Sequence, residues 1–252
     1  MDPAVTENRS RPSIGRWKWA RALYRRTLRL WHGLWLHDAR LRMEYLDRAP
    51  LLVLPDVFDG IRLRTGAFLA RTLEATTVPA GAQVLDLGTG SGVGAIRAAR
   101  WAGRVVATDI NPEAARCAQI NALINRLEQV IETRVGDLFG PVQGERFDLI
   151  LFNPPFYRGQ PRRQRGWRDH AWRSPDAFDR FLDELPAHLR EGGRALVVLS
   201  SDNDIEQALW AAQGLNVRTL REQDFVNEIL TVYEIRVGDG GRGAHEAQGH
   251  PL

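Results

Sequence analysis

Hydrophobic and polar residues form two kinds of segment along the central part of the chain. Short apolar runs predict buried strands at residues 84–87, 105–108, 130–135, 147–152 and 195–199. Between these runs, the spacing of the apolar residues predicts helices near 92–101, 112–126, 176–190 and 203–213. Strands that alternate with helices are typical of a largely parallel sheet that is covered on both faces.

Two further apolar runs, near 215–220 and 229–237, follow the last helix and have only a short connection between them. Parallel neighbours need a long crossover, so this short connection predicts an antiparallel pair at the edge of the sheet. The sequence therefore predicts an α/β fold: a Rossmann-like, mostly parallel sheet with helices on both faces and an antiparallel edge strand.

The N-terminal segment has the pattern of a basic amphipathic helix between Ile14 and Leu36. One face carries the apolar residues Trp17, Ala20, Tyr24, Leu28, Trp31 and Trp35, and another carries Lys18, Arg21, Arg25 and Arg29. We interpret residues 1–50 as a Trp-rich helical arm, 51–237 as the main domain and 238–252 as a frayed, glycine-rich tail. Three roles stay open for the arm: a lid on the main domain, a docking surface for an anionic partner, or attachment to a membrane surface.

The composition is that of a globular protein, with 44% hydrophobic and 26% charged residues among 252. The first 50 residues hold 11 Lys+Arg and five Asp+Glu, so the arm carries +6 within a net charge of +3. Cys117 is the single cysteine, which excludes a disulfide within the chain. No apolar run approaches the roughly 20 residues of a transmembrane helix, and arginines interrupt the N-terminal segment, so we expect a cytoplasmic protein.

A glycine-rich turn, Gly88-Thr89-Gly90-Ser91-Gly92, follows the first predicted strand and opens a helix. Glycine suits such a turn because the backbone needs unusual angles and a ligand must approach it closely. Asp109 ends the next strand and precedes Asn111 at a helix start. A carboxylate at this spacing can accept both hydroxyls of an adenosine ribose. These residues predict a nucleoside-containing cofactor.

The segment from Gly90 to Ala95 also fits the loose dinucleotide fingerprint, so a nicotinamide-dependent dehydrogenase is an alternative. Two features favour S-adenosylmethionine. Asp86 lies within the first strand, where it can meet the cationic amino group of a methionine moiety. Asp137 and Leu138 end the third strand, where the Asp137 side chain can accept from the adenine amino group and the next backbone amide can donate to the ring.

A second motif, Asn153-Pro154-Pro155-Phe156, follows the predicted strand at 147–152. Ligands of open α/β sheets bind beyond the carboxyl ends of the strands, which brings this motif beside the cofactor. An amide or aromatic amino nitrogen is a poor nucleophile because its lone pair is delocalised. The Asn153 side-chain oxygen and the Pro154 carbonyl can hold its N–H groups and aim the lone pair at a methyl carbon. The prolines stiffen the loop, and Phe156 offers an aromatic face.

The next segment is unusually basic. It carries Arg158, Arg162, Arg163, Arg165, Arg168 and Arg173 together with Trp167 and Trp172. Such a segment suits a nucleic-acid backbone with stacked bases, and a solvated loop explains it equally well. We expect Pro155, Phe156, Tyr157 and Arg158 to contact the methyl acceptor. The histidines and Cys117 lack metal-ligand spacing, so no metal site is predicted.

Together these motifs resemble the class I methyltransferases of the amino-methylating group. Within that group the chain is most similar to the release-factor glutamine methyltransferase family and to enzymes that methylate exocyclic amino groups of bases. Residues 64–69 also match a segment that closes over the methionine end of the cofactor. The resemblance spans about residues 53–235 and implies a seven-stranded sheet and S-adenosylmethionine as methyl donor. The implied cofactor-binding residues are Thr65, Asp86, Gly88, Gly90, Asp109, Asn111, Asp137, Leu138 and Asn153.

The chain departs from the family pattern in two places. Phe156 stands where tyrosine is commoner, and the arm of about 50 residues is unlike the longer substrate-recognition domain of bacterial release-factor enzymes. We expect methylation of a planar nitrogen in a macromolecule, first a glutamine side-chain amide in a protein and second an exocyclic amino group of a nucleic-acid base. A small-molecule acceptor and a non-catalytic module that binds nucleic acid or a membrane are the remaining hypotheses.

Overall fold

The computed structural model describes residues 40–161, 167–225 and 228–238, and the predicted arm helix and tail lie outside them. The chain divides into a unit at Met1–Asp38 and a unit at Ala39–Leu252. The second unit therefore begins ahead of residue 51, where we placed the start of the main domain. This unit includes a β-hairpin that the sequence pattern did not indicate. Its two strands are β1 (Arg42–Leu46) and β2 (Ala49–Val53).

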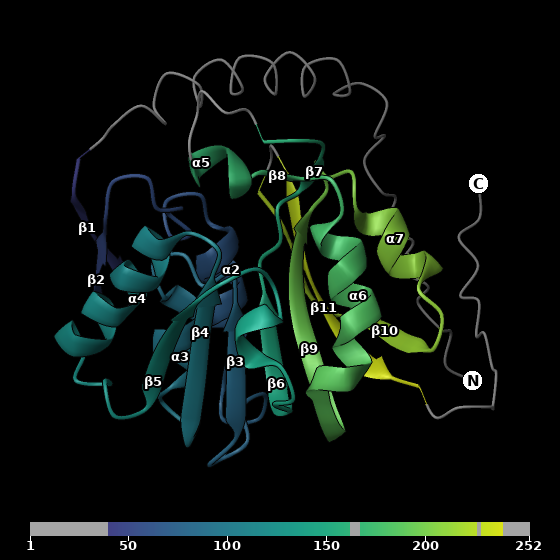
Figure 1. The fold of residues 1–252 in the computed structure, drawn as a ribbon, viewed down its shortest axis with the longest axis horizontal. Helices are drawn as coiled ribbons and strands as arrows, with labels where there is room; N and C mark the ends of the chain where they lie inside the picture. The colour runs from purple at the N-terminus through teal and green to yellow at the C-terminus, as the bar shows by residue number, and fades with distance from the viewer. Residues whose placement is uncertain (1–39, 162–166, 226–227, 239–252) are drawn as a thin grey trace, which may run out of the picture. The chain divides into compact units, whose positions relative to one another are not determined.

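A seven-stranded sheet forms the centre of this unit, in the order β10-β11-β9-β6-β3-β4-β5 (Figure 1). Its strands are β3 (Gln83–Leu87), β4 (Arg104–Asp109), β5 (Ile131–Val135), β6 (Phe147–Phe152), β9 (Leu189–Ser200), β10 (Leu215–Asp224) and β11 (Ile229–Val237). Neighbouring strands from β9 to β5 are parallel, whereas β11 pairs antiparallel with both β9 and β10. The predicted Rossmann-like sheet with an antiparallel edge is confirmed.

Helices cover both faces of this sheet. They are α2 (Thr65–Arg71), α3 (Val93–Ala98), α4 (Pro112–Ile124), α6 (Ala177–His188) and α7 (Glu206–Ala211). A short helix, α5 (Trp167–His170), lies above the strand ends in Figure 1, and a 3-10 turn forms at Gly140–Val142. The predicted helix at 176–190 ends at His188 because β9 already begins at Leu189. A two-residue parallel pair, β7 (Tyr157–Arg158) with β8 (Arg173–Ser174), was not predicted either.

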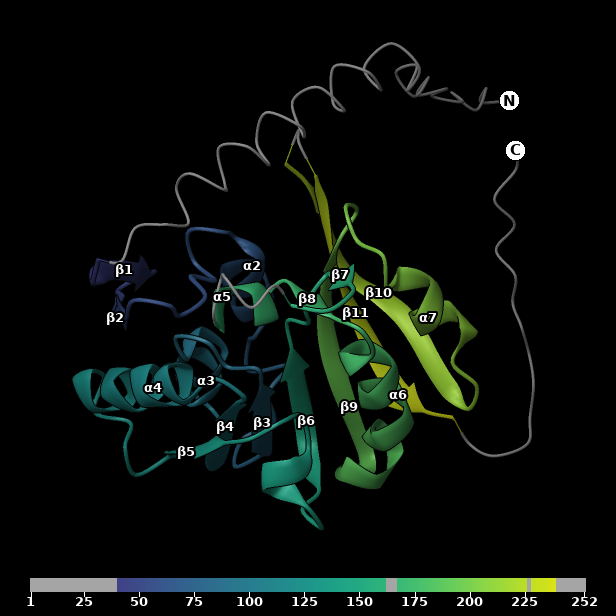
Figure 2. The ribbon, with the colours of Figure 1, turned by 45° about the horizontal axis from the view of Figure 1, so that its top comes forward.

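Consecutive residues of the central strands pack into two separate hydrophobic cores. In β3, Val84 packs with residues of α2 and α3, whereas Leu85 packs with residues of α6 and α7. Figure 2 shows α6 and α7 near one another beside β9. Because both faces of each central strand are buried, these strands read as continuous apolar runs in the sequence.

The register between β3 and β6 positions the candidate site. Leu87, the last residue of β3, lies opposite Phe152, the last residue of β6. The strands are parallel, so the chain leaves both at the same edge of the sheet. The glycine-rich turn that begins at Gly88 therefore lies next to Asn153.

Asn121 on α4 joins the β1–β2 hairpin to the glycine-rich turn. Its side-chain Nδ2 donates to the carbonyl oxygens of Leu52 (2.7 Å) and Ser91 (2.8 Å), and its Oδ1 accepts from the Leu52 amide at 2.7 Å. The side chain is fully buried. Asn121 thus supplies the hydrogen bonds that a neighbouring strand would otherwise give to Leu52.

We predict that Asn121→Ala lowers the free energy of unfolding by about 2–4 kcal/mol, because it leaves buried backbone groups without partners. Urea denaturation followed by circular dichroism measures this change. Gln119→Ala, on the exposed face of the same helix, is the matched control and should shift stability by less than about 0.5 kcal/mol. Equal effects of the two substitutions would contradict the role of Asn121.

Candidate active site

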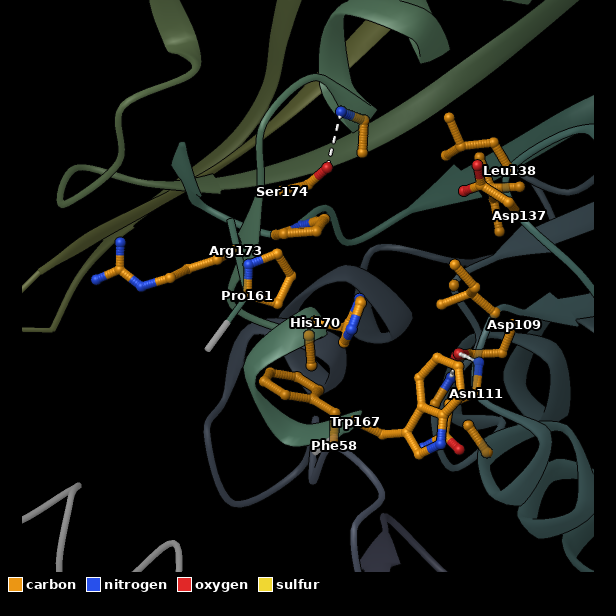
Figure 3. Close-up of a pocket in the computed structure, with 18 of the residues that line it drawn as sticks. Phe58, Asp109, Asn111, Asp137, Leu138, Pro161, Trp167, His170, Arg173 and Ser174 are labelled. Atoms are coloured by element: carbon orange, nitrogen blue, oxygen red, sulfur yellow. Dashed lines mark hydrogen bonds between the residues drawn. The ribbon is translucent and has the colours of Figure 1, made fainter. Parts of the chain in front are cut away.

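A cavity of about 260 Å³ opens beyond the carboxyl ends of the central strands (Figure 3). It brings together residues that follow four strands and that we predicted as site residues: Gly88, Gly90, Asp109, Asn111, Asp137, Leu138, Asn153 and Pro155. A smaller cavity of about 20 Å³ is lined by Asp86 and shares Gly88, Gly90 and Asn153 with the larger one. The sequence motifs therefore converge on two adjoining spaces.

Asp86 holds the glycine-rich turn in place. Its Oδ2 accepts from the Thr89 hydroxyl at 2.6 Å and from the Ala95 amide at 2.8 Å. Burial raises the pKa of Asp86 to about 6, against the opposing effect of these two hydrogen bonds. A Cβ at Gly94 would lie only 2.5 Å from Oδ1 of Asp86, so glycine is required for this close packing. Asp86 therefore shapes the turn as well as lining the smaller cavity.

Asp109 is held by backbone amides at the end of β4. Its Oδ2 accepts from the Gly90 amide and its Oδ1 from the Asn111 amide, both at 2.9 Å. Burial raises the pKa of the Asp109 carboxyl, and the backbone amides oppose that shift. Each carboxylate oxygen has two lone pairs, so this fixed carboxylate can still accept hydroxyl groups from a ligand in the cavity.

Asn111 begins α4. Its Oδ1 accepts from the Glu113 amide at 3.0 Å, which caps the helix, and its Nδ2 donates to the Asp56 carbonyl at 3.1 Å. The predicted helix start with Pro112 at its first turn is found in the structure. Asn111 fixes the segment after Asp109 and also lines the larger cavity.

Asp137 and Leu138 form the wall that follows β5. The Asp137 carboxylate lies 2.8 Å from the Arg180 guanidinium of α6, an ion pair that the sequence did not indicate. Leu138 has a φ of 43°, an uncommon value for a residue with a side chain. The two residues face the larger cavity with Arg180 beside them.

Asn153 lies where the two cavities meet, because it lines both of them. Its side-chain Nδ2 donates to the Thr65 hydroxyl oxygen at 3.1 Å. Thr65, at the start of α2, lines neither cavity. Pro155 lines the larger cavity, whereas the Pro154 side chain is buried.

The residues after Pro155 do not lie where we expected them. Phe156 is 6% exposed and packs in the core with residues of α6, so its ring does not face the cavities. The Tyr157 hydroxyl donates to Asp202 at 3.1 Å. Arg158 forms a bidentate ion pair with Asp179. The chain turns into β7 here, which directs these three side chains away from the cavity that Asn153 and Pro155 line.

The structure adds aromatic and basic residues that we did not assign to the site. Phe58, Trp167, His170 and Arg173 line the larger cavity. The Trp167 and His170 rings lie 5.2 Å apart between their centroids, and Figure 3 shows them with Phe58 at the cavity. Trp167 and Arg173 belong to the basic segment of the sequence, whereas no motif indicated Phe58. Arg162, Arg163 and Arg165 lie outside the described residues, and so does the side chain of Arg168.

Two kinds of feature are absent from the part of the chain that the structure describes. Within it, no three His, Cys, Asp or Glu side chains cluster in a way that could hold a metal ion. None of its helices is long and apolar enough to cross a membrane.

The family model of the methyltransferase small domain matches residues 49–226, which include every cavity-lining residue named above. The chain belongs to the methyltransferase small domain family. Its fold is that of a class I methyltransferase domain, and the cofactor of this family is S-adenosylmethionine. Membership in this family argues against the dehydrogenase alternative.

Curated relatives of this methyltransferase-family chain include enzymes with two kinds of substrate in their names. A release factor glutamine methyltransferase of Cereibacter sphaeroides is 38% identical over 162 residues, which cover 60% of this chain and 54% of that protein. A ribosomal RNA small subunit methyltransferase C of Alcanivorax borkumensis is 31% identical over 157 residues, covering 62% and 43%. The chain spans about half the length of these relatives.

Solved structures share the fold of this methyltransferase domain. The T. thermophilus 16S rRNA N2 G1207 methyltransferase, in complex with AdoMet and guanosine, has a TM-score of 0.60 at 24% identity and covers 79% of this chain and 50% of that chain. A ribosomal protein L11 methylase of Lactobacillus delbrueckii has a TM-score of 0.52 at 21% identity, covering 79% and 100%.

We predict that Thr89→Val destabilises the methyltransferase domain by about 1.5–3 kcal/mol at pH 8, where the Asp86 carboxylate is charged and loses a hydroxyl donor. The loss should be smaller at pH 5. Since burial raises the pKa of Asp86 to about 6, most of this carboxyl is then protonated in the folded state. Urea denaturation at the two pH values measures the difference, with Thr89→Ser as the control that keeps the hydroxyl. An equal loss at both pH values would show that Thr89 does not act through the Asp86 charge.

Proposed function

We propose that this chain transfers the methyl group of S-adenosylmethionine to a planar nitrogen, first of all the side-chain amide of a glutamine in a protein. One observation carries the proposal. Asn153 and Pro155, at the end of β6, line the same cavity as Gly88 and Asp109, at the ends of β3 and β4. A methyl acceptor held at Asn153 would therefore lie next to the cofactor.

The cofactor-binding roles follow the positions of the acidic side chains. Asp109 would accept the ribose hydroxyls, while Asp137 and the Leu138 amide would contact the adenine. Asp86 and the smaller cavity would take the methionine end, and the glycines allow the ligand to approach the backbone. When bound, S-adenosylmethionine would supply an electrophilic methyl group and would leave as S-adenosylhomocysteine, whose sulfur keeps the electron pair of the broken sulfur–methyl bond.

The chain's own residues would activate the acceptor by orienting it. The Asn153 side-chain oxygen and the Pro154 carbonyl would each accept one N–H of the acceptor, which directs the nitrogen lone pair out of conjugation. As the nitrogen gains the methyl carbon, positive charge builds on it, and these two oxygens stabilise that charge. The nitrogen then loses one proton to water, so the product is neutral.

One ion pair at the larger cavity is in keeping with a protein acceptor. Of the two arginines that line the larger cavity, Arg180 is neutralised by Asp137, and Arg173 lies over the Tyr157 ring. Binding of a nucleic-acid backbone depends on basic side chains that neutralise phosphates. A paired arginine is poorly suited to that task.

An exocyclic amino group of a nucleic-acid base is the second candidate. The aromatic rings of Phe58 and Trp167 line the larger cavity and could stack on a base. An amino group on a base also presents two N–H groups, so it could use the same two oxygens. The relative that is named a ribosomal RNA methyltransferase is in keeping with this alternative.

We predict that Asn153→Ala lowers the rate of methyl transfer by about 100-fold or more, because one of two oxygens that stabilise the developing charge is lost. The assay measures labelled methyl transferred from S-adenosylmethionine into a cell extract at saturating cofactor. Asn216→Ala, on the exposed face of β10, is the matched control and should keep the wild-type rate. Full activity of Asn153→Ala would contradict the proposed role of this residue.

The same labelled extract identifies the class of acceptor. We predict that protease treatment, and not nuclease treatment, releases the label from the macromolecular fraction. Release by nuclease would favour the base as acceptor. Label in the small-molecule fraction alone, or no label at all with the wild-type chain, would overturn the proposal of a macromolecular substrate.

A further inference from the structure

We infer that Thr65 is a positioning residue for methyl transfer: its hydroxyl holds the Asn153 amide so that the amide oxygen faces the acceptor. The inference rests on the proposed function, since that function gives Asn153 its contact with the acceptor. It starts from the hydrogen bond that Asn153 Nδ2 donates to Thr65 Oγ1 at 3.1 Å. This bond joins α2 to the end of β6, far apart in the sequence.

Thr65 lies behind Asn153 and not in the cofactor site. Its side chain is 4% exposed, and it is absent from the linings of both cavities. Its neighbours Gly66 and Leu69 line the smaller cavity, and Asn153 lines both. The sequence resemblance placed Thr65 among the cofactor-binding residues, whereas in the described part of the chain its hydroxyl contacts Asn153, which lines both cavities.

The orientation of the Asn153 amide decides what it can bind. The amide oxygen accepts hydrogen bonds and the amide nitrogen donates them, yet the two ends have nearly the same size. A half-turn of the group would therefore fit the same space and present donors to the N–H groups of the acceptor. In the structure the Thr65 hydroxyl accepts from the nitrogen end of the amide, so the oxygen end is left for the acceptor.

The backbone around Thr65 is held firmly enough for this task. The Arg62 amide donates to Asp59 Oδ1 at 2.9 Å, and Arg64 adopts a φ of 68°, an uncommon value for a residue with a side chain. A Cβ on Gly66 would lie 3.0 Å from the Gly60 Cα. The start of α2 thus packs closely against the preceding turn. This packing fixes the position of the Thr65 hydroxyl relative to the end of β6.

Substitutions that differ only in the hydroxyl test this inference. We expect Thr65→Val to lower the rate of labelled methyl transfer at saturating S-adenosylmethionine by about 10- to 100-fold, with an unchanged Kd for S-adenosylhomocysteine in calorimetry. Thr65→Ser should recover most of the rate. Thr72→Val is the matched control, because it removes a buried hydroxyl at the other end of α2 that bonds to the Leu69 carbonyl. It should keep the wild-type rate.

Two results of this experiment would overturn the inference. A wild-type rate in Thr65→Val would show that the hydroxyl does not orient Asn153. The Kd for S-adenosylhomocysteine could instead rise by the same factor as the rate falls. That result would show that Thr65 contributes to cofactor binding. If Thr65→Val does not fold, Thr65→Ser and Thr65→Ala form a second pair, and equal rates in these two would contradict the inference.

A measurement that needs no methyl transfer separates this inference from the proposed function. The side-chain NH₂ signal of Asn153 can be observed by NMR after ¹⁵N-asparagine labelling and assigned by its loss in Asn153→Ala. We expect that signal to move and its protons to exchange faster with water in Thr65→Val. An unchanged signal would overturn the inference, whereas a wild-type chain without transfer activity would overturn the proposed function alone.

Discussion

The parallel pairing of β3 with β6 is the constraint on which the candidate site depends. Leu87 lies opposite Phe152, and both side chains are buried in the core between the sheet and α6. A slip of one residue would turn them to the other face of the sheet, so the core fixes the register. The same register places Gly88 and Asn153 side by side, and it therefore sets how close the glycine-rich turn lies to the motif at residues 153–156.

Buried polar side chains then make this edge of the sheet rigid. Asp109 accepts from the Gly90 amide in the turn between β3 and α3, and Asp86 accepts from the Thr89 hydroxyl in that turn and from the Ala95 amide in α3. Asn121 donates to the carbonyl of Ser91 in the same turn. Buried polar groups are costly unless their hydrogen bonds are satisfied, so each of these contacts favours one conformation of the turn. The hydrogen bond between Asn153 and Thr65 holds the residue that follows β6 in the same way. The site is preorganised chiefly by hydrogen bonds between side chains and backbone.

The sequence predicted the sheet, and the motifs that line the cavities could be found in it, because their signals are local. A buried strand followed by glycines or an acid is visible in a few consecutive residues, as at Asp86 and Asp109. The orientation of Phe156 could not be predicted, since it depends on how the chain turns into β7. Phe58 and the Arg180–Asp137 pair were missed for a related reason. Their roles arise from contacts between segments that are distant in the sequence, and a single sequence carries no signal of such contacts.

The central claim is that the methyl group is transferred to a planar nitrogen whose N–H group donates a hydrogen bond to the Asn153 side chain. The most direct measurement is the chemical identity of the methylated group after transfer of labelled methyl from S-adenosylmethionine. Hot acid hydrolysis of a protein methylated on a glutamine amide releases labelled methylamine, and we predict this product. A labelled N-methyl nucleobase would also be methylated on a planar nitrogen, but it would show that the acceptor is a nucleic acid and not a protein. Label released as methanol by mild alkali would indicate a carboxyl ester and contradict the claim.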